Sequence, residues 1–289
     1  MTARPVVCLD LDRTAIYSAA ALDLRIDDRD APRLQCVEVH HGTPLSYMTE
    51  AAAAALITLA QLSTVVPATT RTLAQLARVH LPGPPARYMI ASNGGHLLVD
   101  GVPDSAWTAR VRAALSRCAP VTEVECYLRG HAADYDPAFV RTLRTASKMF
   151  VYAVVERAAM PPGWVADLAD WCAPRGWTTS VQGRKVYALP VALTKSAAAA
   201  EVVARTGGGP LLAAGDSLLD AELLRYADAA IRPAHGELAE VGFQTEHVAV
   251  TGATGVAAGE ELLYWLLAAI PRVTGQTRTG RCPPPGMPP

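Results

Sequence analysis

The sequence predicts an α/β fold with a mostly parallel sheet, interrupted by an inserted α+β unit. Near both ends of the chain, short apolar runs alternate with helix-like stretches, which is typical of strand–helix–strand units. Between them, residues 102–184 lose this alternation and mix helix and strand patterns. The first apolar run, Val6–Leu9, leads into Asp10 and Asp12. Because open α/β sheets bind ligands at the carboxyl ends of their strands, we expect the functional site there.

The composition indicates a globular protein with a sizeable core. The chain has 289 residues, 51% of them hydrophobic and 18% charged, which suits one large domain or two smaller ones. Its net charge of −1 provides no basic field, so the sequence supports no partnership with nucleic acid or an anionic membrane. The six cysteines include no Cys-x-x-Cys pair, so we expect reduced thiols and a cytoplasmic location. The sequence leaves the oligomeric state open.

The first third of the chain predicts a strand, a hairpin, a helix and two more strands. The polar segment 15–48 contains an alternating stretch, 34–41, followed by a Gly-Thr-Pro turn. This pattern indicates a small hairpin or flap over the end of the first strand. Thr49 is a good N-cap for a helix over 50–62. Two strands follow, over residues 63–68 and 87–91.

The rest of the chain completes the expected fold. In the middle we expect helices over 103–118, 137–147 and 162–172, and strands over 124–128, 149–155, 177–181 and 186–189. Regular alternation then returns, with strands over 211–214, 229–231 and 248–250, and helices over 196–205, 237–241 and 255–270. The tail, 272–289, is dominated by Pro, Gly, Thr and Arg and is expected to be disordered.

Four short motifs lie at the expected junctions between strands, loops and helices. In chain order they are Asp10-Leu11-Asp12-Arg13-Thr14, Thr69-Thr70-Arg71, Lys195, and Gly215-Asp216-Ser217 with Asp220. Their order resembles that of the haloacid-dehalogenase-like (HAD) phosphatases. The insert between the second and third motifs resembles the subgroup with a large α+β cap. That subgroup includes Cof-like sugar phosphatases, sucrose-phosphate phosphatase, mannosyl-phosphoglycerate phosphatase and the eukaryotic-type phosphomannomutases.

This resemblance covers residues 5–270 and implies a division of the chain. It predicts a Rossmann-like HAD core formed by residues 1–101 and 190–271, with an α+β cap over 102–189. The segment after the first motif is longer than usual in the family. Three residues also depart from the family pattern: Arg13 and Ser196 stand where glycine is common, and Leu219 stands where asparagine is common. None of these departures removes a catalytic group, but all of them bear on the substrate.

The acids of the first and last motifs carry the chemistry that the resemblance implies. Asp10 is the expected nucleophile, which would form an aspartyl-phosphate. Asp12 is the expected general acid and base, with a pKa raised by the neighbouring acids. Crowded carboxylates also require a cation, and Mg²⁺ is a hard cation that suits oxygen ligands. We expect it to be bound by Asp10, the backbone carbonyl of Asp12 and Asp216, with Asp220 in support.

Thr69 and Lys195 are expected to hold the phosphoryl oxygens, by hydrogen bond and by charge. Lysine is rare in this chain, and a lysine in the first turn of a helix opposes the helix dipole. Lys195 is therefore better explained by function than by helix stability. Arg184 and Lys185, at the edge of the cap, are candidates for binding a second anionic group of the substrate. A solvated strand edge is the alternative interpretation of these two residues.

The sequence therefore predicts a Mg²⁺-dependent phosphomonoester hydrolase that acts on a small phosphorylated metabolite, a sugar or polyol phosphate, through an aspartyl-phosphate. Two alternatives stay open. A phosphomutase of the phosphomannomutase type would form the same intermediate and return the phosphoryl group to a bound sugar. A non-catalytic protein would use the same scaffold to bind a partner. The presence of all the acids favours an enzyme.

Overall fold

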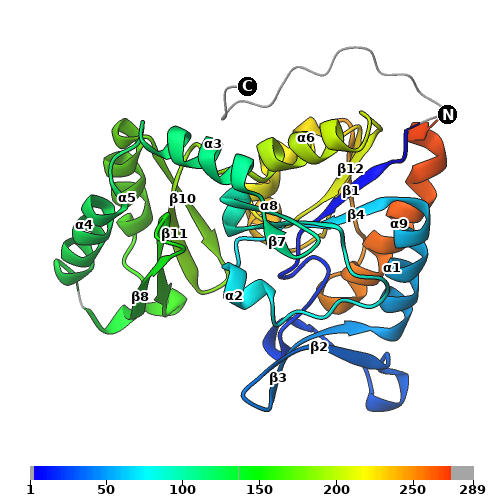
Figure 1. Ribbon diagram of the computed structural model, residues 1–289. Coiled ribbons are helices and arrows are strands. Elements are labelled where there is room, and N and C mark those ends of the chain that lie inside the picture. The colour runs from blue at the N-terminus through cyan, green and yellow to red at the C-terminus, as the bar shows by residue number, and fades with distance from the viewer. Residues whose placement is uncertain (1–2, 136, 275–289) are drawn as a thin grey trace.

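A five-stranded parallel sheet forms the centre of the molecule (Figure 1). The computed structural model describes residues 3–135 and 137–274. The strand order is β14-β13-β12-β1-β4, and every pair is parallel. The strands are β1 (Val6–Leu9), β4 (Thr64–Pro67), β12 (Leu211–Ala214), β13 (Ala229–Arg232) and β14 (Val248–Val250). The predicted α/β class with a mostly parallel sheet is therefore confirmed.

Packing on both faces of this sheet explains why β1 is apolar throughout. All four residues of β1 are buried, and alternate residues face two different hydrophobic clusters. A strand covered on both faces is a continuous apolar run in the sequence, as is usual in parallel sheets between helices. The covering helices are α1 (Glu50–Leu62) and α9 (Gly255–Thr274) on one face, and α6 (Lys195–Arg205) and α7 (Ala221–Tyr226) on the other.

A flap hairpin, residues 34–49, projects from the core below the sheet in Figure 1. Its strands β2 (Leu34–His40) and β3 (Thr43–Thr49) are antiparallel, and its turn contains His41 and Gly42, both with positive φ. The hairpin predicted from the alternating stretch is thus confirmed. A second antiparallel group, linked to the core sheet by a bridge between Ala68 and Ile90, contains β5 (Tyr88–Ala91), β6 (His96–Val99) and β7 (Val102–Pro103).

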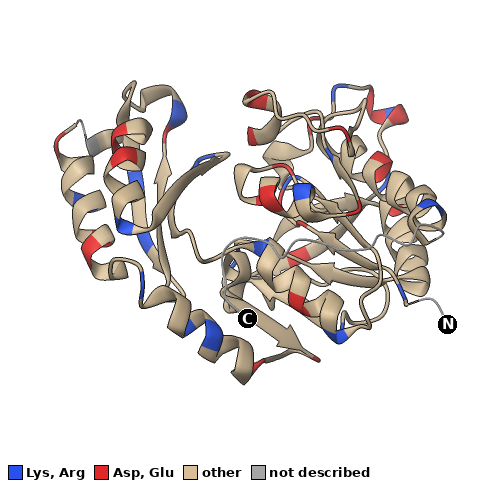
Figure 2. Ribbon diagram, turned by 90° about the horizontal axis from the view of Figure 1, so that it is seen from above, with Lys and Arg blue, Asp and Glu red and all other residues tan. Residues whose placement is uncertain are grey.

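The inserted part of the chain has a separate antiparallel sheet of order β10-β11-β9-β8. Seen from above (Figure 2), its helices lie on the outer side and its strands turn toward the core. Helix α3 (Ser105–Leu115) leads into this part. The other elements are α4 (Val121–Ala133), α5 (Trp164–Cys172), β8 (Val140–Ala146), β9 (Phe150–Val155), β10 (Trp177–Gln182) and β11 (Lys185–Pro190).

Two predicted elements of the insert are wrong. Residues 124–128, expected as a strand, belong to α4, because Val124, Leu128 and Ala132 recur at four-residue spacing on one buried helix face. Residues 137–147, expected as a helix, form a short 3₁₀ turn and then β8. Pairing with β9 fixes the extended form of β8. Short apolar runs do not distinguish helix from strand without such partners.

The last helix extends further than predicted. α9 runs to Thr274, so residues 272–274 of the expected tail are helical, and 275–289 lie outside the described residues. No helix in the described ranges is long and apolar enough to cross a membrane. The remaining short elements are α2 (Leu73–Leu76), α8 (Glu237–Glu240) and 3₁₀ turns at Ala19–Ala21, Asp28–Asp30, Ser92–Gly94, Pro137–Phe139, Arg157–Ala159, Ala173–Arg175 and Leu218–Asp220.

The N-cap of α1 offers a test of how the core is stabilised. Thr49 Oγ1 accepts from the Ala52 amide at 2.9 Å, and the same hydroxyl donates to Glu260 of α9 at 2.8 Å. We expect Thr49→Ala to lower the free energy of unfolding by about 1–2 kcal/mol, because it removes a buried cap. Thr58→Ala, on the exposed face of the same helix, is the control and should change it by less than about 0.5 kcal/mol. Equal losses in urea titrations would contradict this prediction.

Candidate active site

Three strand ends of the core sheet bring most of the predicted site together. The last residues of β1, β4 and β12 are in register, so the chain places Asp10, Thr69 and Asp216 just beyond one edge of the sheet. Ligand atoms of Asp10, Asp216 and Asp220 lie within 4.8 Å of one another, and all three residues are buried. Thr69 is also buried, and its Oγ1 accepts from the Arg71 amide, which leaves the hydroxyl proton available to a ligand oxygen.

Lys195 is the positive charge at the centre of this acidic group. Its side chain is 1% exposed, and its Nζ donates to Asp10 Oδ1 at 2.5 Å and to Asp220 Oδ1 at 2.6 Å. It is the first residue of α6, whose N-cap Thr194 accepts from the Ala197 amide. The buried ammonium thus offsets part of the repulsion among carboxylates that are withdrawn from water.

A tight turn from the neighbouring hairpin fixes the loop that carries Lys195. The Asn93 side-chain amide donates to the Leu193 carbonyl at 2.6 Å. Gly94 has φ +94°, and a Cβ there would lie 2.2 Å from the Thr194 carbonyl oxygen. Only glycine therefore allows this approach. The turn Ser92–Gly95 thus positions the ammonium from outside its own helix.

Burial raises the pKa values of two of the acids, Asp10 and Asp216, above the ordinary range of a carboxyl group. Burial raises the pKa of Asp10 to about 7, although the charge of Lys195 opposes this and Asp220 adds to it. The pKa of Asp216 is raised for the same main reason, with the charges of Asp10 and Asp220 adding to burial. The charges of Asp10 and Asp220 overcome burial and raise the pKa of Lys195, which is therefore protonated. The site without a cation thus favours protonated carboxyl groups.

The donor set fits a hard divalent cation. Its ligand atoms are carboxylate oxygens, which suit Mg²⁺ better than softer metals. Asp220 is held on both sides, since Oδ1 accepts from Lys195 and Oδ2 accepts from the Ser217 amide and hydroxyl. This position of Asp220 requires glycine at residue 215, because a Cβ there would lie 2.3 Å from the Asp220 Cγ. Asp10 and Asp216 are therefore the better direct ligands, with Asp220 as a support.

Asp12 lies outside this acidic group and forms a different contact. Arg71 Nε and Nη2 donate to its two carboxylate oxygens, each at 2.8 Å. Partial loss of hydration would raise the pKa of Asp12, whose side chain is still 47% exposed, but the hydrogen bonds and charge of Arg71 outweigh it, so the pKa is lowered. The sequence-based expectation of a raised pKa for Asp12 is wrong, because it considered the acidic neighbours and missed the arginine.

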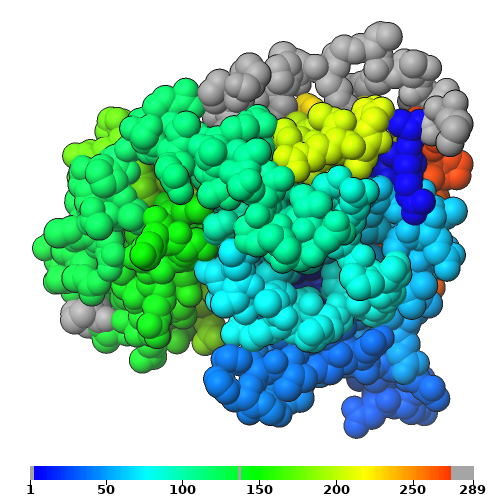
Figure 3. Space-filling view, viewed as in Figure 1, coloured from blue at the N-terminus to red at the C-terminus, as the bar shows by residue number. Residues whose placement is uncertain are grey.

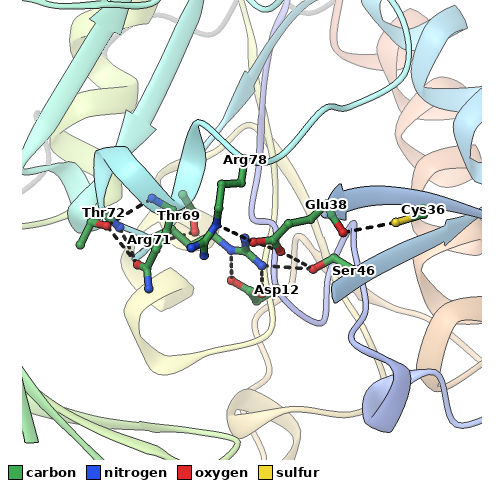
Figure 4. Close-up of polar contacts among 9 residues, drawn as sticks. Asp12, Cys36, Glu38, Ser46, Thr69, Arg71, Thr72 and Arg78 are labelled. Carbon is green, nitrogen blue, oxygen red and sulfur yellow. Dashed lines mark hydrogen bonds and ion pairs between the residues drawn. The ribbon is translucent and has the colours of Figure 1, made fainter. Parts of the chain in front are cut away.

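Arg71, Glu38 and Ser46 are site residues that sequence reasoning missed. Figure 4 shows Arg71 between Asp12 on one side and the flap residues Glu38 and Ser46 on the other. Arg71 belongs to the second motif, Thr69-Thr70-Arg71, so its position indicated a place in the site. Of that motif, only Thr69 was assigned a role from the sequence. Glu38 and Ser46 lie in the flap hairpin, where no local pattern separates a buried polar residue from an exposed one.

The two basic residues predicted at the edge of the cap are placed differently. Lys185, the first residue of β11, has a raised pKa because of the nearby Tyr187 and Asp12, with burial opposing them. Its ammonium also lies 5.6 Å from the centre of the Tyr152 ring. Lys185 therefore lies near Asp12, at the edge of the core sheet where the predicted site residues meet. Arg184 is exposed at the preceding turn and is not brought into the acidic group.

Buried hydrogen bonds hold the insert against the core. Glu237, at the start of α8, accepts from the Ser180 hydroxyl and the Val181 amide of the insert, each at 2.7 Å. It also accepts from the Leu218 amide, between the two acids of the last motif, at 2.9 Å. A hydrogen bond of 2.8 Å also joins the hydroxyls of Ser92 and Ser147. In the space-filling view the insert packs against the core without a break on this face (Figure 3). The catalytic edge therefore lies beside a docked insert.

Comparison with known proteins identifies the fold. No family model matches this sequence, and no curated protein matches it significantly. The sucrose-phosphatase of Synechocystis sp. PCC6803, solved with sucrose and phosphate, matches with a TM-score of 0.60 and 12% identity over 94% of this chain and 99% of that one. A HAD subclass IIB sugar phosphatase matches with a TM-score of 0.52 and 12% identity over 92% and 99%. A trehalose-6-phosphate phosphatase-related protein gives 0.50 and 14% over 92% and 99%.

These matches show that the chain has the fold of the HAD phosphatases with an inserted cap. The resemblance inferred from the four motifs is therefore confirmed at the level of the fold.

The raised pKa of Asp10 predicts how the stability of the metal-free protein depends on pH. Between about pH 4 and pH 7 the folded protein keeps a proton that the unfolded chain has lost. The free energy of unfolding should therefore fall as pH rises through this window, by up to about 1.4 kcal/mol per pH unit. Asp10→Asn should remove this part of the slope in EDTA-treated samples.

Mg²⁺ should reverse the trend, because it binds the ionised carboxylates of the folded state only. Thermal melts at pH 5 and pH 8 should therefore show a larger increase in Tm with Mg²⁺ at pH 8. A pH-independent difference between the wild type and Asp10→Asn would contradict the shift.

Proposed function

We propose that this protein is a Mg²⁺-dependent phosphomonoester hydrolase that acts on a small sugar or polyol phosphate. The observation that carries the proposal is the buried Lys195 between Asp10 and Asp220, with Asp216 alongside, at the carboxyl ends of β1 and β12. A cluster of this charge is costly to bury unless a cation and an anion complete it. The sucrose-phosphatase and the sugar phosphatase that share the fold support a sugar phosphate as the substrate class.

The residues present support a two-step reaction. Asp10 would attack phosphorus and form an aspartyl-phosphate, while Thr69 and Lys195 hold phosphoryl oxygens. Asp12 would give a proton to the leaving oxygen and later take one from the water that attacks the aspartyl-phosphate. Mg²⁺ held by Asp10 and Asp216 would supply positive charge to the phosphoryl group.

We further propose that residues 1–101 and 190–271 act as the catalytic core and 102–189 as a cap. The separate sheet of the insert and its hydrogen bonds to Glu237, which also binds the loop of the last motif, support this division. A cap in this position would favour a small metabolite over a polymer. We expect the enzyme to work in the cytoplasm, because its cysteines include no Cys-x-x-Cys pair. We expect no nucleic-acid or membrane partner, because its net charge is weak.

The nucleophile is tested by Asp10→Asn, an almost isosteric change that removes the attacking carboxylate. Phosphate release from a panel of sugar and polyol phosphates should fall by at least about a thousandfold, because the covalent step is lost. Asp100→Asn, at an exposed turn with φ +49°, is the control and should keep wild-type rates. EDTA should abolish turnover and Mg²⁺ should restore it. Retained turnover in Asp10→Asn, or in the chelated wild type, would contradict the mechanism.

The cap residues give a matched pair of variants. Lys185→Gln should raise KM for the preferred metabolite about tenfold, because a charge near the site is lost. Arg184→Gln, one residue earlier and exposed, should leave KM within about twofold of the wild type. Steady-state kinetics on the two variants check this prediction. Equal changes in KM would show that Lys185 contributes no more to substrate binding than the exposed Arg184.

A further inference from the structure

Glu38 is a buried carboxylate in the flap hairpin, outside the four motifs. It is 2% exposed. Its Oε2 accepts from the Ser46 hydroxyl at 2.6 Å and from Arg71 Nη1 at 2.8 Å, and its Oε1 accepts from Arg78 Nε at 3.1 Å. Burying an ionised carboxylate is costly unless hydrogen bonds and opposite charges compensate it. Ser46, Arg71 and Arg78 provide this compensation for Glu38.

Arg71 connects this carboxylate to the catalytic motif. Its Nε and Nη2 bind both oxygens of Asp12 at 2.8 Å, while Nη1 binds Glu38 and Nη2 also lies 3.3 Å from the Ser46 hydroxyl. All three guanidinium nitrogens are thus engaged, and a planar guanidinium held on two sides cannot rotate without breaking bonds on both. Because two hydrogen bonds join the Asp12 carboxylate to this guanidinium, the orientation of Arg71 also fixes the orientation of the carboxylate.

The exposure of the two partners gives the arrangement a direction. The Arg71 side chain is 11% exposed, whereas that of Asp12 is 47% exposed. Arg71 therefore lies behind Asp12, between it and the flap, and the open side of Asp12 faces away from the arginine (Figure 4). A carboxyl group that exchanges protons with a substrate must be accessible and must also keep a fixed orientation. Asp12 is accessible because it is half exposed, and Arg71 holds its orientation.

We propose that Glu38 is a positioning residue that acts through Arg71 on Asp12, so that the flap hairpin is part of the active site. Glu38 touches no reacting atom. It fixes the guanidinium and shares the positive charge that would otherwise be directed at Asp12 alone. Ser46, which binds both Glu38 and Arg71, supports the same arrangement.

This inference rests on the proposed function, and specifically on the first chemical step. In that step an oxygen of Asp10 bonds to phosphorus and the bond from phosphorus to the leaving oxygen breaks. A proton that Asp12 has taken up from solvent passes to the leaving oxygen. A strongly basic alkoxide needs this proton, whereas a weakly basic nitrophenolate leaves without it. Misplacing Asp12 should therefore slow substrates according to their leaving group.

The test compares kcat/KM for benzyl phosphate and 4-nitrophenyl phosphate, two substrates of similar size, because this ratio reports the first step. Glu38→Gln keeps the shape and removes the charge. It should lower kcat/KM for benzyl phosphate by about tenfold or more and that for 4-nitrophenyl phosphate by less than about threefold. Ser46→Ala, which changes no charge, should show the same selectivity with a smaller loss and covers the case in which Glu38→Gln does not fold.

Arg78→Gln is the matched control, because Arg78 binds Glu38 but has no hydrogen bond to Asp12. It should leave the ratio between the two substrates unchanged. Equal losses on both substrates in Glu38→Gln and Ser46→Ala would overturn the inference, and so would a shift in Arg78→Gln as large as that in Glu38→Gln. A wild-type enzyme that releases phosphate with Mg²⁺ from neither of these substrates, nor from any member of the sugar and polyol phosphate panel, would instead refute the proposed function.

Discussion

The buried ammonium of Lys195 is the interaction on which the rest of the site depends. Asp10, Asp216 and Asp220 together carry three negative charges when ionised. Lys195 and Arg13, whose Nε lies 3.7 Å from Asp216 Oδ2, carry two positive charges, which leaves one negative charge. A divalent cation would more than balance this remainder. Without Lys195 the three acids would repel each other in a buried space, and without Asp220 the ammonium would lack one of its two partners. Each of these residues is therefore tolerated in the interior because of the others.

The fold explains why these groups meet although they are far apart in the sequence. β1 lies between β4 and β12, and parallel strands end on the same side of the sheet, so motifs separated by up to about two hundred residues share one edge. The insert ends with β11 at Pro190, and the chain then leads directly into Lys195 at the start of α6. Glu237 then joins two groups of the insert to the loop between Asp216 and Asp220. The position of the insert and the position of the last motif are thus tied by one buried carboxylate.

The parts that could be predicted are those with a local signal. The apolar β1 followed by two acids, and Thr49 before an alanine-rich helix, are fixed by neighbours within a few residues. The two elements of the insert that were predicted wrongly, residues 124–128 and 137–147, lack such a local signal. For example, β8 is extended through its pairing with β9. The Arg71–Glu38 pair is non-local in the same way, since thirty-three positions separate the partners. A polar residue in an alternating hairpin reads as exposed until its partner across the fold is known.

Asp10 and Asp12 show how environment separates two identical side chains one residue apart. Burial raises the pKa of Asp10, whereas Arg71 lowers that of the half-exposed Asp12. In the metal-free site this order is the reverse of what a nucleophile and a general acid require. A cation bound by Asp10 would lower the pKa of that carboxylate and restore it as a nucleophile. Asp12 lies outside the acidic group, and its carboxylate is held by Arg71, which Glu38 binds in turn. In the proposed mechanism the cation would thus act on Asp10, whereas the flap hairpin would act on Asp12 through Arg71.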